Sequence, residues 1–494
     1  MSGIRKQAIT SSILVYAGTL IGALNTYFFI SYFSKEQYGL TRLFSDVGQN
    51  FYIFSTLGVI PVLYKFYPYY KDNLEDKKND LLGRTFLISG IGFILVTIGA
   101  IVFEPLVVQK FSKNASLFVA YYFWVIPFSF GLLFFSILES YSWVLQKTVI
   151  SNFLRETGLR ICILILVLLY IGQLISFYTF MVLFAMTYIV IAVVLMVYFI
   201  KTKKVHLTLT KSRVTKKYAK KIWSMQGLIF GGIIITTLGQ TIDGLIISSL
   251  LGLDLAGVYT LALYMSNLIQ VPQRSISTIA TGVLARNWKD KNFAEITRIY
   301  QRSSINMLII SLFIFGNIWL NITDGLTVVG VFDKYGAGIP LVFIFGIIRV
   351  IDGGTGVNAQ IIATSTFWRF EFISGIVMLA LRIPLTYIFV KQYGIIGSAY
   401  SDLISLTVYN FIRYEFLRRK YGMQPFSGKT FYVIVLCLLA FGVAYYAGYG
   451  LLGWPAIFLR SIVFSGIIAT GVFFFQLTPD ARQVYDNLLH RLRK

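Results

Sequence analysis

Residues 176–200 read SFYTFMVLFAMTYIVIAVVLMVYFI, an apolar stretch without Lys, Arg, Asp or Glu. A helix rising about 1.5 Å per residue needs roughly 20 such residues to cross a hydrocarbon core of roughly 30 Å, so this stretch predicts a membrane span. Comparable stretches recur along the whole chain and predict an all-α, polytopic membrane protein with fourteen transmembrane helices. We expect these spans near residues 9–33, 43–67, 86–109, 117–141, 150–172, 176–200, 222–250, 256–283, 304–321, 338–364, 370–390, 395–414, 430–450 and 456–476.

The distribution of basic residues predicts the orientation of these spans. The chain has 44 Lys and Arg against 21 Asp and Glu, which gives a formal net charge of +23. If the N-terminus is inside, most basic residues fall in inner loops and tails, as the positive-inside rule requires, and both termini are cytoplasmic. The expected outer loops hold six of them: Lys35, Arg42, Lys110, Lys113, Lys334 and Lys391.

The composition argues against several other classes of protein. A hydrophobic fraction of 56% leaves little soluble surface, so the positive charge does not predict nucleic-acid binding. Cys162 and Cys437 lie in expected spans, while His206 and His490 lie in basic inner segments, so we expect neither a disulfide framework nor a metal site. The expected loops are short. We therefore expect no catalytic residues and no cofactor.

An internal repeat predicts two lobes. An ungapped shift aligns residues 25–43 with 243–261, pairing Asn25 with Asp243 and Gly39 with Gly257. Parallel repeats of six helices are a common transporter architecture, although two amphipathic hairpins of one membrane protein can also look alike by chance. The predicted parts are an N-lobe with the first six spans (1–200), a basic cytoplasmic linker (201–221), a C-lobe with the next six spans (222–420), and two further spans with a basic cytoplasmic tail (421–494).

Small residues and prolines mark expected contacts and bends within the spans. Each repeat copy begins with two glycines four residues apart, Gly18 with Gly22 and Gly227 with Gly231, a spacing that lets transmembrane backbones approach closely. Pro61 and Pro272 fall inside expected spans, where each removes a backbone donor and favours a bend around a cavity.

Polar side chains in the expected spans are candidate functional residues, because burying them in a bilayer is unfavourable. Gln240 and Asp243 lie three residues apart in the span near 222–250, and Gln270 and Gln273 lie three apart in the next span, with Arg274 beside them. Residues three or four apart share one face of a helix. These faces predict the lining of a water-accessible cavity.

Further charged residues are expected at a similar depth. Arg349 and Asp352 lie three apart in the span near 338–364, and Arg382 and Asp402 lie in the two spans that follow. Two alternatives remain open for the arginines. Arg349 and Asp352 could form a local ion pair that neutralises itself, and Arg382 could extend to the membrane surface.

In the first half, polar residues of the expected spans also point to a cavity. Asn25, Asp46 and Asn50 are candidates for its lining, with Asp46 close enough to the outer surface to be solvated. We expect Glu139 to lie at the inner interface and Arg460 to be a surface-seeking anchor.

Several segments resemble bacterial polysaccharide flippases. They are Asp243–Tyr259 (DGLIISSLLGLDLAGVY), its counterpart Ser34–Gly39 (SKEQYG), Tyr393–Tyr400 (YGIIGSAY) and Arg418–Phe426 (RRKYGMQPF). The resemblance covers the first twelve spans, and the expected total of fourteen matches these proteins, which belong to the multidrug/oligosaccharidyl-lipid/polysaccharide exporter superfamily.

The resemblance implies two six-helix lobes around a V-shaped cavity in a bacterial cytoplasmic membrane. It implies transport of a polyprenyl-pyrophosphate-linked oligosaccharide from the inner to the outer leaflet by alternating access, with polysaccharide polymerases as candidate partners. Cavity arginines would attract the pyrophosphate, which suits Arg274, Arg349 and Arg382. Acidic residues would couple transport to H⁺ or Na⁺, which suits Asp243 or Asp402.

Two other functions stay open at this stage. One is a multidrug or small-solute/ion antiporter on the same fold. The other is a membrane-embedded polysaccharide polymerase or ligase, although such enzymes usually carry a large outer loop with catalytic residues, which the expected topology does not provide.

Overall fold

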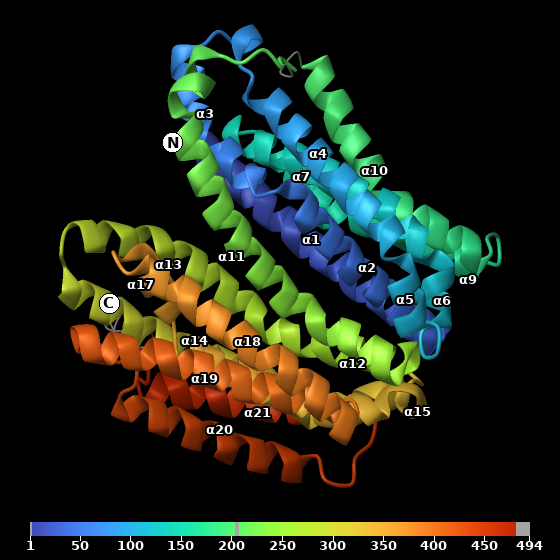
Figure 1. Ribbon diagram of the computed structural model, residues 1–494. Helices are drawn as coiled ribbons and strands as arrows, with labels where there is room; N and C mark the ends of the chain where they lie inside the picture. The colour runs from blue at the N-terminus through green and yellow to red at the C-terminus, as the bar shows by residue number, and fades with distance from the viewer. Residues whose placement is uncertain (1, 203–206, 481–494) are drawn as a thin grey trace. The chain divides into compact units, whose positions relative to one another are not determined.

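The computed structural model describes residues 2–202 and 207–480, and all regular secondary structure in those residues is helical (Figure 1). The all-α prediction is confirmed. The chain divides into two compact units, Met1–Gly257 and Val258–Lys494. The predicted lobe, linker and tail boundaries stay a prediction. Of those segments, 203–206 with His206 and 481–494 with His490 lie outside the described residues.

The first unit is a helical bundle in which α2 packs against α4, α7 and α11. Its elements are α1 (Ser2–Tyr32), α2 (Lys35–Thr56), α3 (Val59–Asn73), η1 (Asp76–Lys78), α4 (Leu81–Val102), α5 (Glu104–Phe111), α6 (Ser116–Tyr121), η2 (Tyr122–Trp124), α7 (Val125–Val144), α8 (Thr148–Asn152), η3 (Phe153–Gly158), α9 (Leu159–Ile171), α10 (Phe177–Lys201), α11 (Arg213–Leu251) and the first turn of α12 (Leu253–Asn267). The N-terminal turn of α2 is fixed by a capping box, in which Ser34 and Gln37 each bond to the other's backbone N–H.

The second unit contains the rest of α12 and the helices that follow it. They are η4 (Leu268–Gln270), α13 (Val271–Lys289), α14 (Phe293–Val328), α15 (Phe332–Tyr335), η5 (Gly336–Gly338), α16 (Ile339–Gly354), α17 (Asn358–Thr364), α18 (Trp368–Tyr393), α19 (Ile396–Tyr421), α20 (Gly428–Ala447) and α21 (Trp454–Phe474). Helices α18 and α19 pack along one another, and the C-terminal hairpin of α20 and α21 packs against α14.

Nine helices among the described residues are long and apolar enough to cross a membrane. This confirms a multi-pass membrane protein, while the total of fourteen spans stays a prediction. Several expected spans are divided into shorter helices. The span near 43–67, for example, becomes α2 and α3, and the span near 256–283 becomes α12, η4 and α13.

The break between α2 and α3 shows why one expected span is divided. Leu57 and Gly58 adopt the left-handed conformation, with φ of 45° and 74°, so the helix stops and restarts at Val59. Pro61 therefore lies in the first turn of α3, where a missing N–H breaks no helical bond. The Gln226 amide of α11 donates to the Leu57 carbonyl at 2.8 Å and stabilises the break.

A second break corrects the expected helix near 338–364. Helix α16 ends at Gly354, Gly356 has a φ of 62°, and α17 begins at Asn358. Asp352 therefore lies in the last turn of α16, and the expected span near 338–364 is not one continuous helix.

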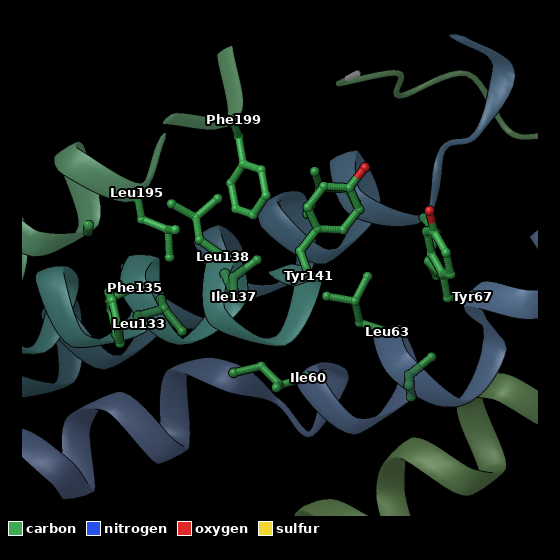
Figure 2. Packing of buried hydrophobic residues seen from close by; sticks show 14 of the residues in the cluster. Ile60, Leu63, Tyr67, Leu133, Phe135, Ile137, Leu138, Tyr141, Leu195 and Phe199 are labelled. Atoms are coloured by element: carbon green, nitrogen blue, oxygen red, sulfur yellow. The ribbon is translucent and has the colours of Figure 1, made fainter. Parts of the chain in front are cut away.

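Each unit has its own apolar core. In the first unit, Ile60 and Leu63 of α3 pack with Leu138 of α7 and Leu195 of α10 (Figure 2). In the second unit, α14, α20 and α21 share a cluster that includes Val433, Cys437, Phe464 and Ile468. The lone cysteine of that cluster is thus a packing residue.

Close glycine contacts are found at Gly18 and Gly22 of one predicted pair but not at Gly227 of the other. A Cβ at Gly18 would collide with the Glu156 carbonyl of η3, and a Cβ at Gly22 would press on Arg160, so these glycines let α1 approach η3 and α9. A Cβ at Gly227, within the described residues, meets nothing within 4 Å. The expected close contact at Gly227 was wrong.

The two glycines that the repeat pairs with one another are in mutual contact. A Cβ on Gly39 would collide with the first turn of α12 at Leu253 and Gly257, and a Cβ on Gly257 would collide with Lys35 and Gly39 of α2. Both positions therefore need a residue without a side chain.

Candidate functional site

A cluster of polar side chains in the second unit surrounds Arg349 of α16. Its guanidinium donates to Asn267 Oδ1 of α12 at 3.0 Å, and its backbone carbonyl accepts a bond from Gln273 of α13 at 3.1 Å. The Gln273 amide also reaches Ser311 of α14 at 2.6 Å. The Nε of Arg349 is buried and has no hydrogen-bond partner among the described residues.

Arg349 has carboxylates in its electrostatic surroundings but no ion pair with the part of the chain that the structure describes. Asp402 and Asp352 attract its charge, whereas Arg382 repels it. Asp352 instead accepts a hydrogen bond from Asn410 of α19 at 3.2 Å. The local Arg349–Asp352 ion pair, one of the two readings that the sequence left open, is not formed.

Arg382 and Asp402 are joined across α18 and α19. The Arg382 guanidinium lies 2.6 Å from Asp402, and the two side chains are 10% and 4% exposed. The backbone carbonyl of Arg382 also accepts from Ser401 at 3.2 Å. Arg382 therefore does not extend to the membrane surface, because the packing of the two helices places a carboxylate beside it inside the unit.

The four remaining candidates of the predicted headgroup site differ in exposure. Arg274 of α13 is exposed, Gln270 of η4 is partly exposed, and Gln273 is buried. Because η4 interrupts the helix before α13, these residues do not form one uniform face. Gln240 of α11 is likewise exposed, whereas Asp243 on the next turn is buried.

The first unit contains a separate polar layer between α2 and α11. Asp46 is only 1% exposed and pairs with Arg42 one turn before it, at 3.0 Å. Asn50 donates to the Asp46 carbonyl at 2.8 Å and to the Thr241 hydroxyl at 2.9 Å, and Asp243 acts electrostatically on Asp46. The expectation that Asp46 is solvated was wrong, because α11 covers it.

Asn25 lies at a different junction from these residues. Its amide donates to the Arg160 carbonyl of α9 at 2.9 Å, and its Oδ1 is buried without a partner among the described residues. Asn25 therefore links α1 to α9. The repeat alignment with Asp243 gave no indication of this contact.

Sequence reasoning missed several buried ion pairs. Glu139 is buried and pairs with Arg155 of η3, so it is not an interfacial residue as expected. Arg460 is partly buried and lies 2.6 Å from Asp324, whose carboxylate accepts a second bond from the Gly453 N–H. The partners are far apart in sequence, so no local spacing could have revealed them.

Two more charged contacts lie near helix ends of the second unit. Glu371 of α18 forms an ion pair with Arg413 of α19, in which Arg413 Nε lies 2.9 Å from Glu371 Oε2. Beyond α21, Arg302 and Asn306 of α14 bond to Asp480, and the Arg302 guanidinium lowers the pKa of that carboxyl. The paired residues are 42 positions apart for Glu371 with Arg413 and 174 positions apart for Asn306 with Asp480, so neither contact is local in sequence.

A comparison with protein families decides what kind of chain this is. The family model described as "Polysaccharide biosynthesis protein" matches residues 4–285, more than half of the chain. The chain belongs to this family. The resemblance predicted from the hairpin segments is thereby confirmed. A search of curated proteins finds no significant match to this chain.

Several solved transporter structures have a fold similar to that of this chain. The lipid II flippase MurJ, in an inward closed conformation, matches with a TM-score of 0.73 and 17% identity over 95% of this chain and 99% of that one. An inward-facing multidrug resistance MATE family transporter of the MOP superfamily matches with a TM-score of 0.67 and 14% identity over 84% and 99%.

A third structure extends the likeness to another transporter. It is a MOP superfamily transporter from Pyrococcus furiosus, with a TM-score of 0.56 and 15% identity over 83% of this chain and 95% of that one. The family member described here thus has the MOP transporter fold, as predicted. At these identities the likeness concerns the fold, so substrate and coupling must be argued from the residues.

Proposed function

We propose that this chain is a flippase that moves a polyprenyl-pyrophosphate-linked oligosaccharide from the cytoplasmic to the outer leaflet for cell-surface polysaccharide synthesis. It works by alternating access and breaks no covalent bond. It lies in a bacterial cytoplasmic membrane with both termini inside, and a polysaccharide polymerase takes up its product. H⁺ or Na⁺ drives the cycle through acidic residues, of which Asp243 and Asp402 are the candidates.

The observation that carries the proposal is that Arg349 forms no ion pair with a carboxylate in the described part of the chain. The buried Arg382 and the partly buried Arg460 each lie 2.6 Å from a carboxylate. Arg349 instead donates to the amide oxygen of Asn267. Placing a charged arginine at mid-membrane costs roughly 2.5–3.5 kcal/mol on insertion scales, which favours a functional role.

The chemistry of arginine fits a pyrophosphate headgroup. A guanidinium stays charged at any relevant pH and donates two parallel hydrogen bonds to a phosphate. Its attraction for an anion is stronger in a medium of low dielectric constant than in water. Arg274, which is exposed on α13, supplies a second positive charge to the proposed site, and Gln270, Gln273 and Gln240 are its candidate polar contacts.

The test is export of a defined lipid-linked glycan from proteoliposomes. Arg349→Ala should lose most transport, and Arg349→Lys should keep part of it because the charge remains while the paired donors are lost. Arg286→Ala is the matched control, since that side chain is 85% exposed and should transport normally. Expression and unfolding temperature are measured for each variant.

A double variant separates the headgroup role from a structural one. If Arg349 only balanced Asp352, then Arg349→Ala with Asp352→Ala would restore transport, because no buried charge would be left alone. Asp352 is held by Asn410 instead, so we expect the loss to persist in the double variant. Full recovery of transport would refute the headgroup role.

A multidrug or small-solute/ion antiporter is the second candidate function. The fold of the MATE transporters and the buried Asp46–Asp243 layer favour it. Ion-driven efflux of cationic drugs from the same proteoliposomes, without movement of the lipid-linked glycan, would support this alternative. A polymerase or ligase would instead be revealed by new glycosidic bonds, which we do not expect.

A further inference from the structure

A small polar cavity in the first unit lies apart from the polar layers described above. Its volume is about 270 Å³, and it is bounded by the end of α3, by η1, by the start of α4 and by the turn after α7. This is slightly below the volume of typical ligand pockets, roughly 300–1,000 Å³, so the occupant must be small. The topology predicted from the basic residues puts these loops on the cytoplasmic face.

Two tyrosines form one wall of the cavity. The rings of Tyr67 and Tyr141 pack edge to face with centroids 6.1 Å apart, above the apolar core of the unit. Figure 2 shows both hydroxyl oxygens on the same side of that core. Tyr67 is only 8% exposed, lines the cavity, and has no hydrogen-bond partner among the described residues. Its hydroxyl is therefore available to a ligand.

The remaining polar groups of the cavity include positively charged and negatively charged side chains. Lys71 and Lys147 supply ammonium groups, the latter 5.3 Å from the centre of the Tyr198 ring. Asp76 lies close enough to act electrostatically on both tyrosine hydroxyls, and it forms no ion pair within the described part of the chain. A ligand that suits this set has an anionic group for the lysines and hydroxyl groups for the carboxylate.

The rim of the cavity is held in an unusual backbone conformation. Gln146 lines the cavity with a φ of 56°, although it is not a glycine. Two hydrogen bonds close the turn. The Lys147 N–H donates to the Ser142 carbonyl at 3.0 Å, and the Ser142 hydroxyl donates to the Lys147 carbonyl at 2.6 Å. Strained residues held in place by their surroundings cluster at binding sites.

We propose that this cavity binds a glycosyl phosphate. The lysines contact the phosphate, Asp76 and the Tyr67 hydroxyl contact sugar hydroxyls, and the aromatic wall contacts the apolar face of the sugar ring. The phosphate belongs either to a free sugar phosphate or to the headgroup of a lipid-linked sugar at the inner leaflet. The proposal does not rest on the transport function or on Arg349.

The test is titration calorimetry on the full-length chain in lipid nanodiscs. The probes are glucose 1-phosphate and a short-chain prenyl-phosphate-linked glucose. Binding of glucose 1-phosphate alone assigns the site to a free sugar phosphate, and binding of the prenyl-linked probe, with or without the other, assigns it to a lipid headgroup. If neither probe binds, the cavity holds only water and the proposal is overturned.

Conservative variants localise the binding. Tyr67→Phe keeps the ring and removes the hydroxyl, and it should weaken binding about tenfold or more. Lys71→Gln should weaken binding of the phosphorylated probe by a similar factor. Tyr69→Phe and Lys65→Gln, on the same helix but outside the cavity, are the matched controls and should bind as the natural chain does.

Binding that is unchanged in Tyr67→Phe and Lys71→Gln would overturn the proposal even if the natural chain binds the probe. Arg349 does not line the cavity, so binding that is lost in Arg349→Ala but kept in Tyr67→Phe and Lys71→Gln would place the probe at Arg349 and would overturn the cavity proposal. A failure of the transport proposal and a failure of this one are therefore distinguishable.

Discussion

The charged side chains in the polar layers of the two units have different partners. In the first unit, Asp46 is neutralised by Arg42 on its own helix and its surroundings are completed by Asn50. In the second unit, Arg382 and Asp402 neutralise one another, but Arg349 has only the amide oxygen of Asn267. In the first arrangement the buried carboxylate of Asp46 has an arginine as its ion-pair partner. The second contains a guanidinium, that of Arg349, which forms no ion pair with the described residues.

The difference between the paired Arg382 and the unpaired Arg349 is tested most directly by removing the ion pair between α18 and α19. Arg382→Met leaves Asp402 buried beside an apolar side chain, so it should destabilise the chain by about 3–5 kcal/mol. Arg382→Met with Asp402→Leu should recover most of the loss. Arg349→Met should cost much less, because it leaves no partner carboxylate unpaired. Unfolding in detergent, followed by circular dichroism, measures the three variants, and equal losses in both single variants would contradict the contrast.

Substitution of glycines in the first unit should have an intermediate effect, which depends on how closely another helix approaches each glycine. Gly39→Ala forces a methyl group into the backbone of α12 and should cost about 1–3 kcal/mol. Gly227→Ala is the matched control, because its Cβ meets nothing within 4 Å, and it should be neutral or stabilise by up to about 1 kcal/mol. Thermal unfolding distinguishes them. A neutral Gly39→Ala would show that α2 and α12 separate freely at this contact.

The smallest effect on stability is expected at Asp243, a buried acidic residue of the polar layer in the first unit. Asp243→Asn keeps the shape of the side chain and should change unfolding by less than about 1 kcal/mol, within the usual range for mild substitutions. If Asp243 couples ions, the variant should lose the dependence of transport on pH or on sodium. Transport measured across pH 6–8 with and without a sodium gradient tests this, and unchanged dependence removes Asp243 from the coupling role.

The sequence predicted the features that depend on local composition. Long apolar stretches indicated the helices, and the hairpin segments around Gly39 and Gly257 indicated the family. The glycine spacing at Gly18 correctly predicted a close contact. The same spacing failed at Gly227, because a pair of small residues permits an approach without requiring it.

The candidate site was only partly predictable. The residues Arg349, Arg382 and Asp402 were found, since charge inside an apolar stretch is visible in sequence. Their pairing was not: Arg382 binds a carboxylate on the following helix, and Asp352 is held by Asn410. Spacing along one helix suggests neighbours on that helix only, and the breaks at Leu57 and Gly356 divide two expected spans into shorter helices.

The sequence alone determined that this chain is a helical membrane protein of the polysaccharide biosynthesis family, because the energy of placing a segment in a bilayer depends on that segment's own length and hydrophobicity. Only the tertiary structure decided which charges are compensated. Arg460 meets Asp324 and Glu139 meets Arg155 because separate helices pack side by side. Arg349 forms no ion pair with the described residues for the same reason: its hydrogen-bond partners on the adjoining helices are the side-chain amides of Asn267 and Gln273, and that arrangement arises only when the helices assemble.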